Sequence, residues 1–399
     1  MHTLELNTLL EASRPGGPTA LGAVSHLQPA AGEHALVAPA KYTKGKDSTY
    51  VYEDRFVDGE LRRTVLIDSR SSAANRMEAA MRQAIENEDP VLSKMPHVSV
   101  TYADKDGKQR VFCDYSLPHR LWDAHIRLGT VNGVPVTQVP EYRAARNART
   151  EEAWPLFAMS PVTILFGGWD STRRTNQSRF PSAITGEIIG ILNAEPGQEH
   201  PTKRSGARID PLGASIQLEA SVAQDLAIAQ SNEISPNLLK AISKQKGIVS
   251  ASNLGLGAIP PGTTALDGIA TSDIIRSYAL SFSTLRRLRF GKGSEGDAAI
   301  RALLSAMGVM AMVHNDAELY IRANCHLVES GPTKLRLDQR QGNFLDIEPL
   351  SVAEADQLLT DAYEYASRVA GVDWHGQCLE VIGNPAVALG AEATADGAE

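Results

Sequence analysis

The chain is poor in cysteine and in aromatic residues, with three Cys and 6% Phe, Trp and Tyr among 399 positions. Cys113, Cys325 and Cys378 lie far apart, so no disulfide framework of a small secreted domain is indicated. The N-terminus lacks the basic start, apolar core and cleavage site of a signal peptide. No apolar run reaches the roughly 18 residues that span a bilayer. These absences predict a soluble cytoplasmic protein without a membrane partner.

Positive charge is also in deficit, with 39 Lys and Arg against 47 Asp and Glu and a net charge of −8. That balance argues against a protein coated in nucleic acid. The charges are nevertheless segregated along the chain, and acid gathers at 348–361 and after Ala391. The basic stretches are Lys41–Lys46, Arg173–Arg179, Lys203–Arg208 and Arg286–Lys292. This separation is compatible with one basic groove on an acidic body.

The hydrophobic fraction of 43% is ordinary for a globular protein and excludes disorder of the whole chain. Strand and helix patterns are interleaved, which predicts an α+β fold. Thr64–Ile67 predicts a buried strand, and helical spacing follows to about Glu88. Val162–Phe166 predicts a second buried strand, followed by a helix over about Pro181–Leu192. The repeated order of strand, Ser/Arg-rich connection and helix suggests a weak internal duplication.

Further elements are expected on either side of these segments. Strands at 97–102 and 110–113 flank Asp104–Lys108, where Asp106-Gly107 indicates a hairpin turn. Residues 1–60 predict loops around a short strand or two, and 194–275 predict a Gly/Pro/Ser-rich insertion. The remaining expected elements are a short helix near Leu117–Arg127, strands at Tyr278–Phe290, Glu318–Val328 and Leu335–Leu337, and helices at Asp297–His314 and Val352–Val369.

A glycine motif, Gly291–Gly296, has the G-x-G-x-x-G spacing of a dinucleotide-binding loop. Its context is poor, because too little chain follows it for a full doubly wound domain. Glu329, the acid that would contact the ribose, lies beyond the usual spacing of about 20 residues. A dinucleotide-dependent oxidoreductase is therefore kept only as the alternative function, and an ordinary glycine-rich connection is favoured.

Motifs for other chemistry are weak or missing. His375 and Cys378 have usable metal-ligand spacing, but with Cys325 and His326 they make a poor zinc set, and buried thiols with surface imidazoles are favoured. The sequence contains no Walker loop, HExxH or G-x-S-x-G. We therefore predict no catalytic residue, no metal and no cofactor, and a protein that is not an enzyme.

Three arginine-bearing segments are more informative. The first places hydroxyl, amide and guanidinium groups over the first turns of a predicted helix, where phosphate oxygens find donors and positive charge. Its candidate RNA-binding residues are Ser69, Arg70, Ser71, Asn75 and Arg76. A capped helix whose arginines point to solvent would give the same pattern.

The second segment follows the next predicted strand and carries Trp169, on which a base could stack, with Arg173, Arg174 and Arg179. The third provides Arg286, Arg287 and Lys292, argued from charge alone. A solvated strand face explains any one segment by itself. Three together favour the backbone of a single-stranded nucleic acid as the ligand.

The stretches Val65–Glu78, Leu165–Arg173 and Arg179–Gly190 resemble the backbone subunit of type I-G (formerly I-U) CRISPR Cascade complexes, a family of the RAMP superfamily. The resemblance spans roughly residues 60–370. It implies a hand-shaped protein with an RRM-like (ferredoxin-like) palm and large finger and thumb insertions. The implied division is an N-terminal region 1–60, palm segments 61–90, 161–193 and 276–384, a finger 91–160, a thumb 194–275 and a disordered tail 385–399.

The same resemblance implies the partners and the role. Several copies would form a helical head-to-tail filament along one CRISPR RNA and present its spacer for pairing with target DNA, and the subunit itself would cut nothing. The other partners implied are the large subunit and the fused cap/RNA-processing subunit of Cascade. By position, Ser69, Ser71, Asn75, Arg76, Arg173, Arg174 and Arg179 would contact the RNA backbone.

Overall fold

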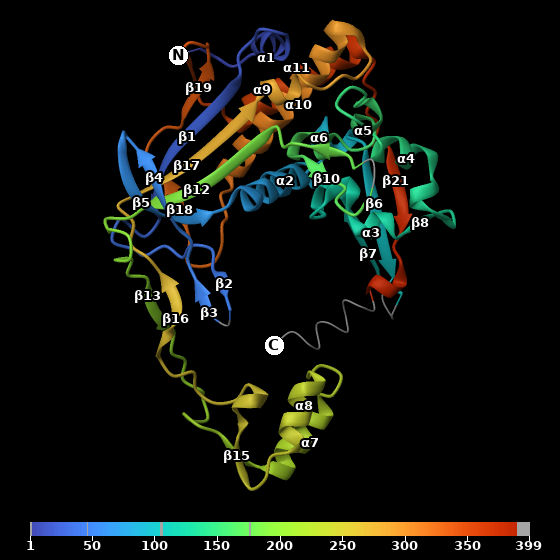
Figure 1. Cartoon of the computed structure of the whole chain (residues 1–399). Coiled ribbons are helices and arrows are strands. Elements are labelled where there is room, and N and C mark those ends of the chain that lie inside the picture. Colours follow the sequence, from blue (N-terminus) through green and yellow to red (C-terminus); the bar gives the residue numbers. More distant parts are fainter. Residues whose placement is uncertain (1, 46, 104–106, 175–176, 389–399) are drawn as a thin grey trace. The chain divides into compact units, whose positions relative to one another are not determined.

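The computed structural model describes residues 2–45, 47–103, 107–174 and 177–388. The chain divides into two compact units (Figure 1). The larger unit comprises Met1–Glu199 and Ala270–Asn384, and the smaller one comprises His200–Ile269 with Pro385–Glu399. Both units combine helices and strands, so the predicted α+β class is confirmed.

The larger unit is built on one antiparallel sheet. Its strands, in spatial order, are β20 (Phe344–Ile347), β19 (Lys334–Asp338), β1 (Ala20–Pro29), β17 (Asp273–Ser281), β12 (Ile184–Ile191), β5 (Glu60–Asp68) and β4 (Tyr52–Val57). β18 (Leu327–Glu329) also pairs with β1.

The chain order of the central elements is that of the ferredoxin-like fold. β1, helix α2 (Arg70–Glu86), β12, β17, helix α10 (Gly293–Ala317) and β19 follow one another as β-α-β-β-α-β. In space these four strands lie in the order β19-β1-β17-β12, with antiparallel neighbours. This is the split β-α-β arrangement expected for an RRM-like palm. β5 and β4 extend it beyond β12.

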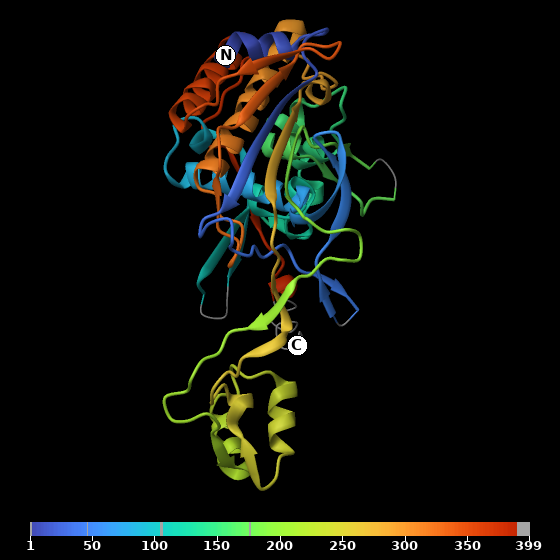
Figure 2. The same ribbon diagram turned by 90° about the vertical axis from the view of Figure 1, so that its left-hand side faces the viewer.

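Helices cover one face of this sheet (Figures 1 and 2). α10 packs against α1 (Leu6–Ser13), α2 and α11 (Val352–Ala370), and its Gly308 faces β17 and β12. By length and composition α10 could cross a membrane, but 94% of its most apolar window is buried inside the protein. It is therefore the core helix of the larger unit.

Alternation along the strands explains which face is covered. In β1, Leu21, Ala23 and Leu27 are buried, whereas Val24 and Gln28 on the other face are exposed. A period of two directs alternate side chains to opposite faces of a sheet, so one face joins the core and the other remains open.

A second sheet lies in the same unit, in the order β7 (Gln109–Cys113), β6 (His97–Ala103), β21 (Cys378–Ile382), β8 (Thr130–Val131) and β9 (Val134–Pro135). β6 and β7 are antiparallel partners, which confirms the predicted strand pair. The turn expected at Asp104–Lys108 includes 104–106, which lie outside the described residues. β21 comes from the C-terminal part of the chain and runs parallel to β6.

Two apolar segments were assigned to the wrong class. Val162–Phe166, expected to be a strand, lies in helix α6 (Pro161–Phe166), and the expected helix at 181–192 contains the central strand β12. α6 and the second half of β12 are buried throughout, so their apolar runs do not show the one-sided period that separates a helix from a strand. Pro161 at the first helical turn indicates the helix. The proposed internal duplication is therefore wrong.

Several other predicted elements differ from the observed ones in length or in type. The strand expected over Tyr278–Phe290 ends at Ser281 and is followed by helix α9 (Phe282–Leu285), so 286–289 do not lie on a strand. Only Leu327–Glu329 form a strand where Glu318–Val328 was expected. The N-terminal region, expected to be mainly loops, contributes α1 and the ten-residue β1. The strand at 335–337 and the helix at 352–369 are confirmed.

Short elements complete the larger unit. They are β2 (Tyr42–Lys44), β3 (Asp47–Thr49), β10 (Gly168–Trp169), β11 (Arg179–Phe180), α3 (Ala124–Arg127), α4 (Pro140–Arg146), α5 (Trp154–Phe157) and the 3-10 turns at Leu92–Lys94, Asp114–Ser116, Arg120–Trp122 and Val136–Gln138.

The smaller unit has its own small core. Ala223, Ala227 and Ile242 are buried where its two helices pack together. Its elements are β13 (Thr202–Ser205), β14 (Gln217–Glu219), α7 (Ala220–Ala229), α8 (Pro236–Ser243), β15 (Ile248–Ser250), a 3-10 turn (Ala251–Leu254) and β16 (Gly262–Gly268).

Candidate nucleic-acid interface

The first turn of α2 presents hydrogen-bonding groups at the surface. Ser69 caps the helix, its hydroxyl accepting a hydrogen bond from the Ser72 amide at 3.3 Å, and it lies 3.2 Å from the Ser71 hydroxyl. Arg70, Ser71 and Asn75 are exposed. The positive end of the helix dipole and these donors together suit an anionic ligand.

Arg76 has a different environment. Its guanidinium is only 15% exposed and pairs with the buried carboxylate of Asp68, the last residue of β5. Burial and the neighbouring Arg322 lower the pKa of Arg76. Arg322 also faces Asp68, at 3.7 Å. Arg76 thus joins α2 to β5, and the RNA contact expected of it stays a prediction.

Arg70 lies at the edge of a small ionic network. Arg55 on β4 bonds to Glu187 on β12 at 2.5 Å and to Glu53, and this pairing holds the pKa of Glu187 below its usual range. Arg70 approaches Glu187 only to 3.7 Å and is 72% exposed. Its guanidinium therefore remains accessible to a ligand.

The second basic segment folds into a hairpin made by β10 and β11. Gly167, which precedes it, has φ 77°, and a Cβ there would lie 2.5 Å from the backbone nitrogen of Ser182, so only glycine fits. Trp169 and Arg179 are paired across the hairpin, and the guanidinium carbon lies 5.1 Å from the indole ring centre. Trp169 is 47% exposed. An exposed indole beside a guanidinium is a stacking platform for a base.

The arginines of this hairpin divide into anchored and exposed groups. Asp170 is buried and bonds to Arg146 at 2.8 Å. Arg173 lies 3.8 Å from Asp170 and donates to Asn147 at 2.7 Å, so its side chain is anchored. Arg174 and Arg179 are exposed.

Arg120 connects the two predicted segments. It binds both carboxylate oxygens of Glu78 on α2, at 2.5 and 2.8 Å, and it donates to the carbonyl of Gly167 at 2.9 Å. Burial raises the pKa of Glu78, although Arg120 opposes the shift. The first helix and the base of the hairpin are thus held in one framework, a connection that the sequence did not predict.

A groove of about 680 Å³ follows the side of α2. Asn75 and Arg82 line it from the helix, and Phe112 and Tyr115 line it from the end of β7 and the turn that follows. Of these, only Asn75 was predicted from the sequence. The exposed apolar residues of edge strand β7, Val111 and Phe112, are the signal that could have indicated this groove.

The central strands of the main sheet lack the stacking aromatics typical of RRM domains, and the exposed Phe56 and Phe344 lie on its edge strands β4 and β20. On the described strands β1, β12 and β17, the only Phe, Trp or Tyr is Tyr278, which is buried. Such a face suits a protein that holds the nucleic-acid backbone more than it reads bases.

The third segment has mixed roles. Arg286 donates to the carbonyls of Ala12 and Pro18, both at 2.6 Å, and burial lowers its pKa. Arg287 is exposed. The ammonium of Lys292 lies 3.7 Å from the Trp154 ring centre. No described contact links these residues to the first two segments.

The glycine motif at 291–296 does not have the setting of a dinucleotide loop. The preceding strand, β17, is antiparallel to both its neighbours and ends ten residues earlier. The Asp297 carboxylate accepts hydrogen bonds from the amides of Phe290 and Lys292, both at 3.1 Å. The chain's own Asp297 carboxylate thus occupies amides of this loop, so nothing in it favours the oxidoreductase alternative.

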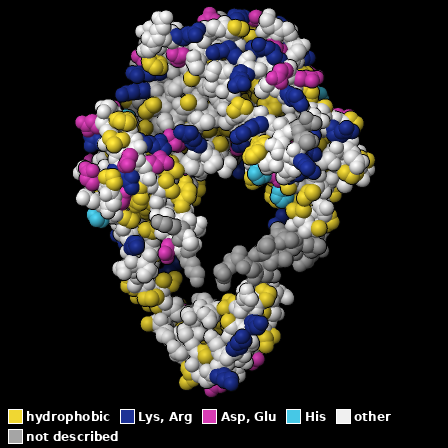
Figure 3. All heavy atoms as spheres, viewed as in Figure 1, with side chains coloured by type: hydrophobic (Ala, Val, Ile, Leu, Met, Phe, Trp, Pro, Cys, Tyr) yellow, Lys and Arg dark blue, Asp and Glu magenta, His cyan; other side chains and the backbone are white. Residues whose placement is uncertain are grey.

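Charge on the visible surface is mixed. In Figure 3, Lys and Arg side chains are spread over the larger unit among acidic ones, without one continuous track on that face. The expected single basic groove is not seen on this face.

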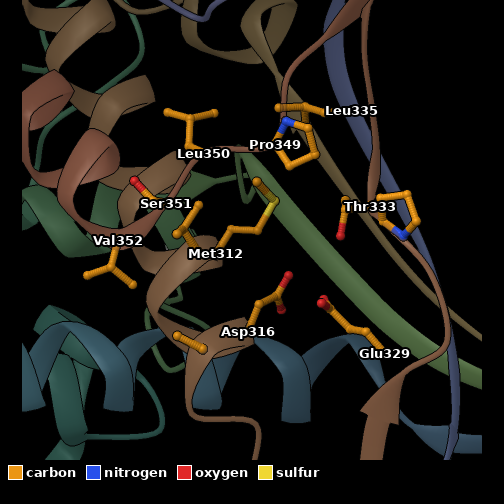
Figure 4. Close-up of a pocket in the computed structure, with 12 residues that line it drawn as sticks. Met312, Asp316, Glu329, Thr333, Leu335, Pro349, Leu350, Ser351 and Val352 are labelled. Atoms are coloured by element: carbon orange, nitrogen blue, oxygen red, sulfur yellow. The ribbon is translucent and has the colours of Figure 1, made fainter.

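A separate cavity of about 320 Å³ lies between the end of α10, the turn before β19 and the start of α11 (Figure 4). Asp316 and Glu329 form its polar end, and the buried Arg276 bonds to them at 2.9 and 2.6 Å. Burial raises the pKa of Asp316 to about 6. No residue of the basic segments lines this cavity.

Within the described ranges, no group of three or more His, Cys, Asp and Glu side chains is placed to hold a metal ion.

Comparison with known families gives one match. The family described as CRISPR-associated protein GSU0053 (Cas_GSU0053) matches residues 21–194, just under half of the chain. This segment runs from β1 to the end of β12 and includes α2 and the β10–β11 hairpin. Over it the chain is similar to a CRISPR-associated family, which supports a role in CRISPR defence. No curated protein matches the chain.

Proposed function

We propose that the protein binds CRISPR RNA through the RNA backbone, as the backbone subunit of a type I-G Cascade complex. The observation that carries this proposal is the position of two donor-rich surfaces, the first turn of α2 and the β10–β11 hairpin. Both lie within the segment that matches a CRISPR-associated family. Arg120 contacts both, through Glu78 and Gly167.

The chemistry of these surfaces supports contact with phosphate. Arg70, Arg174 and Arg179 are exposed guanidiniums, and Ser71 and Asn75 add neutral donors. Guanidinium groups bind phosphate oxygens by charge-assisted hydrogen bonds, which fix the strand without reading its sequence. Trp169 adds a stacking surface that accepts any base. Binding should therefore depend on salt and hardly on sequence.

In the proposed complex, copies of the chain form a head-to-tail filament along the RNA, and target DNA pairs with the spacer. The second sheet would serve as the finger and the smaller unit as the thumb. The large subunit and the fused cap/RNA-processing subunit would complete the assembly, and this subunit would have no catalytic role. The net charge of −8 indicates that neighbouring copies are needed to build a strong binding groove.

The test compares single-stranded RNA binding by two variants of equal charge. One replaces Arg70, Arg174 and Arg179 with alanine, and the matched control replaces Arg62, Arg336 and Arg368, which are exposed elsewhere. With a labelled RNA of about 30 nucleotides, the slope of log affinity against log salt should become shallower by about 2 in the first variant, at about 0.7 per lost phosphate contact.

The control variant should retain the salt dependence of the wild type, and RNAs of unrelated sequence should bind alike. Equal slopes for the two variants would remove these arginines from the interface. Failure of the wild type to bind RNA at low salt would contradict the proposed function.

A further inference from the structure

Cys378 and His97 face each other on neighbouring strands of the second sheet. They are register partners in the parallel pair β21–β6, so their side chains lie on the same face of the sheet, and both line one cavity. The Cys378 sulfur also lies 3.2 Å from the Ser99 hydroxyl, two residues along β6. The exposed thiol thus has an imidazole and a hydroxyl as immediate neighbours.

The imidazole is held in place from its other side. His97 Nδ1 lies 3.2 Å from the carbonyl oxygen of Met95, and its ring centre is 5.9 Å from that of Tyr115. With Nδ1 donating to that carbonyl, Nε2 is left to face the thiol. A base oriented by a third group beside a nucleophile is the arrangement that activates cysteine in other proteins.

The electrostatics agree with this geometry. Burial tends to raise the pKa of Cys378, but hydrogen bonds from His97 and Ser99 outweigh it and the pKa is lowered. The bond to Cys378 raises the pKa of His97 to about 9. The other titratable groups nearby are Asp114, which also favours the charged imidazole, Cys113, Tyr115 and Glu141.

The pair opens into a cavity of about 450 Å³. Its wall is apolar, formed by Trp154, Pro155, Ala158 and Met159, and one carboxylate, Glu141, lines it. A ligand with a short aliphatic body and a positive charge would satisfy both the apolar wall and the carboxylate.

The other two cysteines lack this setting. Cys113 lies on β7, which pairs with the edge of β6 opposite to β21, and its register partner is Ser99. Burial raises the pKa of its thiol. Cys325 is buried, and its pKa is raised for the same reason. Thiolate character is what makes a cysteine reactive, so the three thiols should differ strongly.

We propose that Cys378 is a site of thiol–disulfide exchange with small aliphatic disulfides that carry amino groups, with His97 as its partner base. The Cys378 thiolate attacks one sulfur of the disulfide, a new S–S bond forms and the original one breaks. The departing thiolate takes the proton held by His97, so the products are a mixed disulfide on Cys378 and one free small thiol. No electron is gained or lost overall, because the disulfide supplies the oxidising equivalents.

The test treats the purified full-length chain with cystamine and, in parallel, with dithiodipropionate, which is anionic. Peptide mass spectrometry follows the three cysteines at about pH 6, where an ordinary thiol is almost entirely protonated. Cys378 should react at least about tenfold faster than Cys113, and cystamine should react faster than dithiodipropionate. Glu141→Gln should remove the preference for cystamine.

His97→Gln should slow the reaction of Cys378 at pH 6 about tenfold and restore an increase in rate with pH, as for an ordinary thiol. The wild-type pH profile provides a readout that needs no variant, because the rate at Cys378 should rise less steeply between about pH 6 and 8 than the rate at Cys113. A rate that rises about tenfold per pH unit, or equal reaction of Cys378 and Cys113, would overturn the proposal.

Discussion

The β10–β11 hairpin and the turn after β17 are both rich in arginine, yet Arg179 of the hairpin and Arg286 of the turn act in opposite ways. In the hairpin, Arg174 and Arg179 remain at the surface. In the turn, Arg286 is directed inward and binds the carbonyls of Ala12 and Pro18. The same residue type in similar local sequence therefore presents charge to a ligand in one region and closes the fold in the other.

The difference depends on what lies opposite each guanidinium. The hairpin contains one buried acid, Asp170, which Arg146 and Arg173 already engage. The turn after β17 faces backbone carbonyls from α1 and the segment after it, which need donors. Helix α2 repeats the contrast within two turns, because Arg70 is exposed and Arg76 is paired.

The largest effect is expected for Arg76→Ala. The substitution leaves the buried Asp68 carboxylate with only the more distant Arg322 at 3.7 Å. Removing one partner of a buried ion pair costs about 3 kcal/mol or more. Urea unfolding should show this loss, whereas Arg70→Ala on the same helix should change stability by less than about 0.5 kcal/mol. Similar losses of stability for the two variants would contradict the distinction between a paired Arg76 and an exposed Arg70.

A smaller effect is expected for Arg286→Ala. Two backbone carbonyls lose a charged donor, and hydrogen bonds to charged groups contribute about 1.5–3 kcal/mol each when both groups are buried. Arg286 is half-buried, so we expect a loss of about 2 kcal/mol. Thermal unfolding provides the measurement, with Arg287→Ala as the matched control. An unchanged midpoint for Arg286→Ala would show that the inward contact is dispensable.

A pH-dependent effect is expected for Asp114, a fully buried acid in the turn after β7. Burial raises its pKa to about 6. The folded protein therefore holds more protons than the unfolded chain between about pH 4 and 6, and this group lowers stability as pH rises through that window. Asp114→Asn should remove this dependence.

The gain from Asp114→Asn should be about 3 kcal/mol at pH 7, because a pKa raised from 3.8 to about 6 counts about 1.4 kcal/mol per pH unit, and it should vanish near pH 4. Denaturant unfolding at several pH values measures it. If the wild type and Asp114→Asn had the same stability at every pH, the Asp114 carboxyl would not titrate differently in the folded and unfolded states.

The elements that the sequence predicted correctly have one buried and one exposed face, because their apolar residues then recur at a regular spacing. Helix α11 has an amphipathic period and a capping box at Ser351 and Glu354, and its bounds were predicted closely. The β6–β7 pair alternates and was also predicted. α6 and the second half of β12 are buried throughout, so their apolar runs carry no one-sided period, and the two segments were assigned to the wrong classes.

The site was predicted less completely than the fold. Local chemistry predicted donors on α2 and an indole at Trp169 that the structure leaves exposed, and their contact with RNA stays a prediction. It could not show that Arg286 binds carbonyls more than 260 residues away in the chain, or that Arg120 joins α2 to the hairpin. These contacts depend on tertiary structure, which a local pattern does not encode.

The strands that border the smaller unit have a practical consequence for protein engineering. β12 and β17 are adjacent antiparallel strands, and Ile191 pairs with Asp273 where the chain leaves and re-enters the sheet. The two cut points therefore lie on neighbouring strands, and a short turn could replace the intervening segment without breaking the register. Residues 200–269 of the smaller unit could thus be deleted or exchanged while the larger unit keeps its full set of sheet strands.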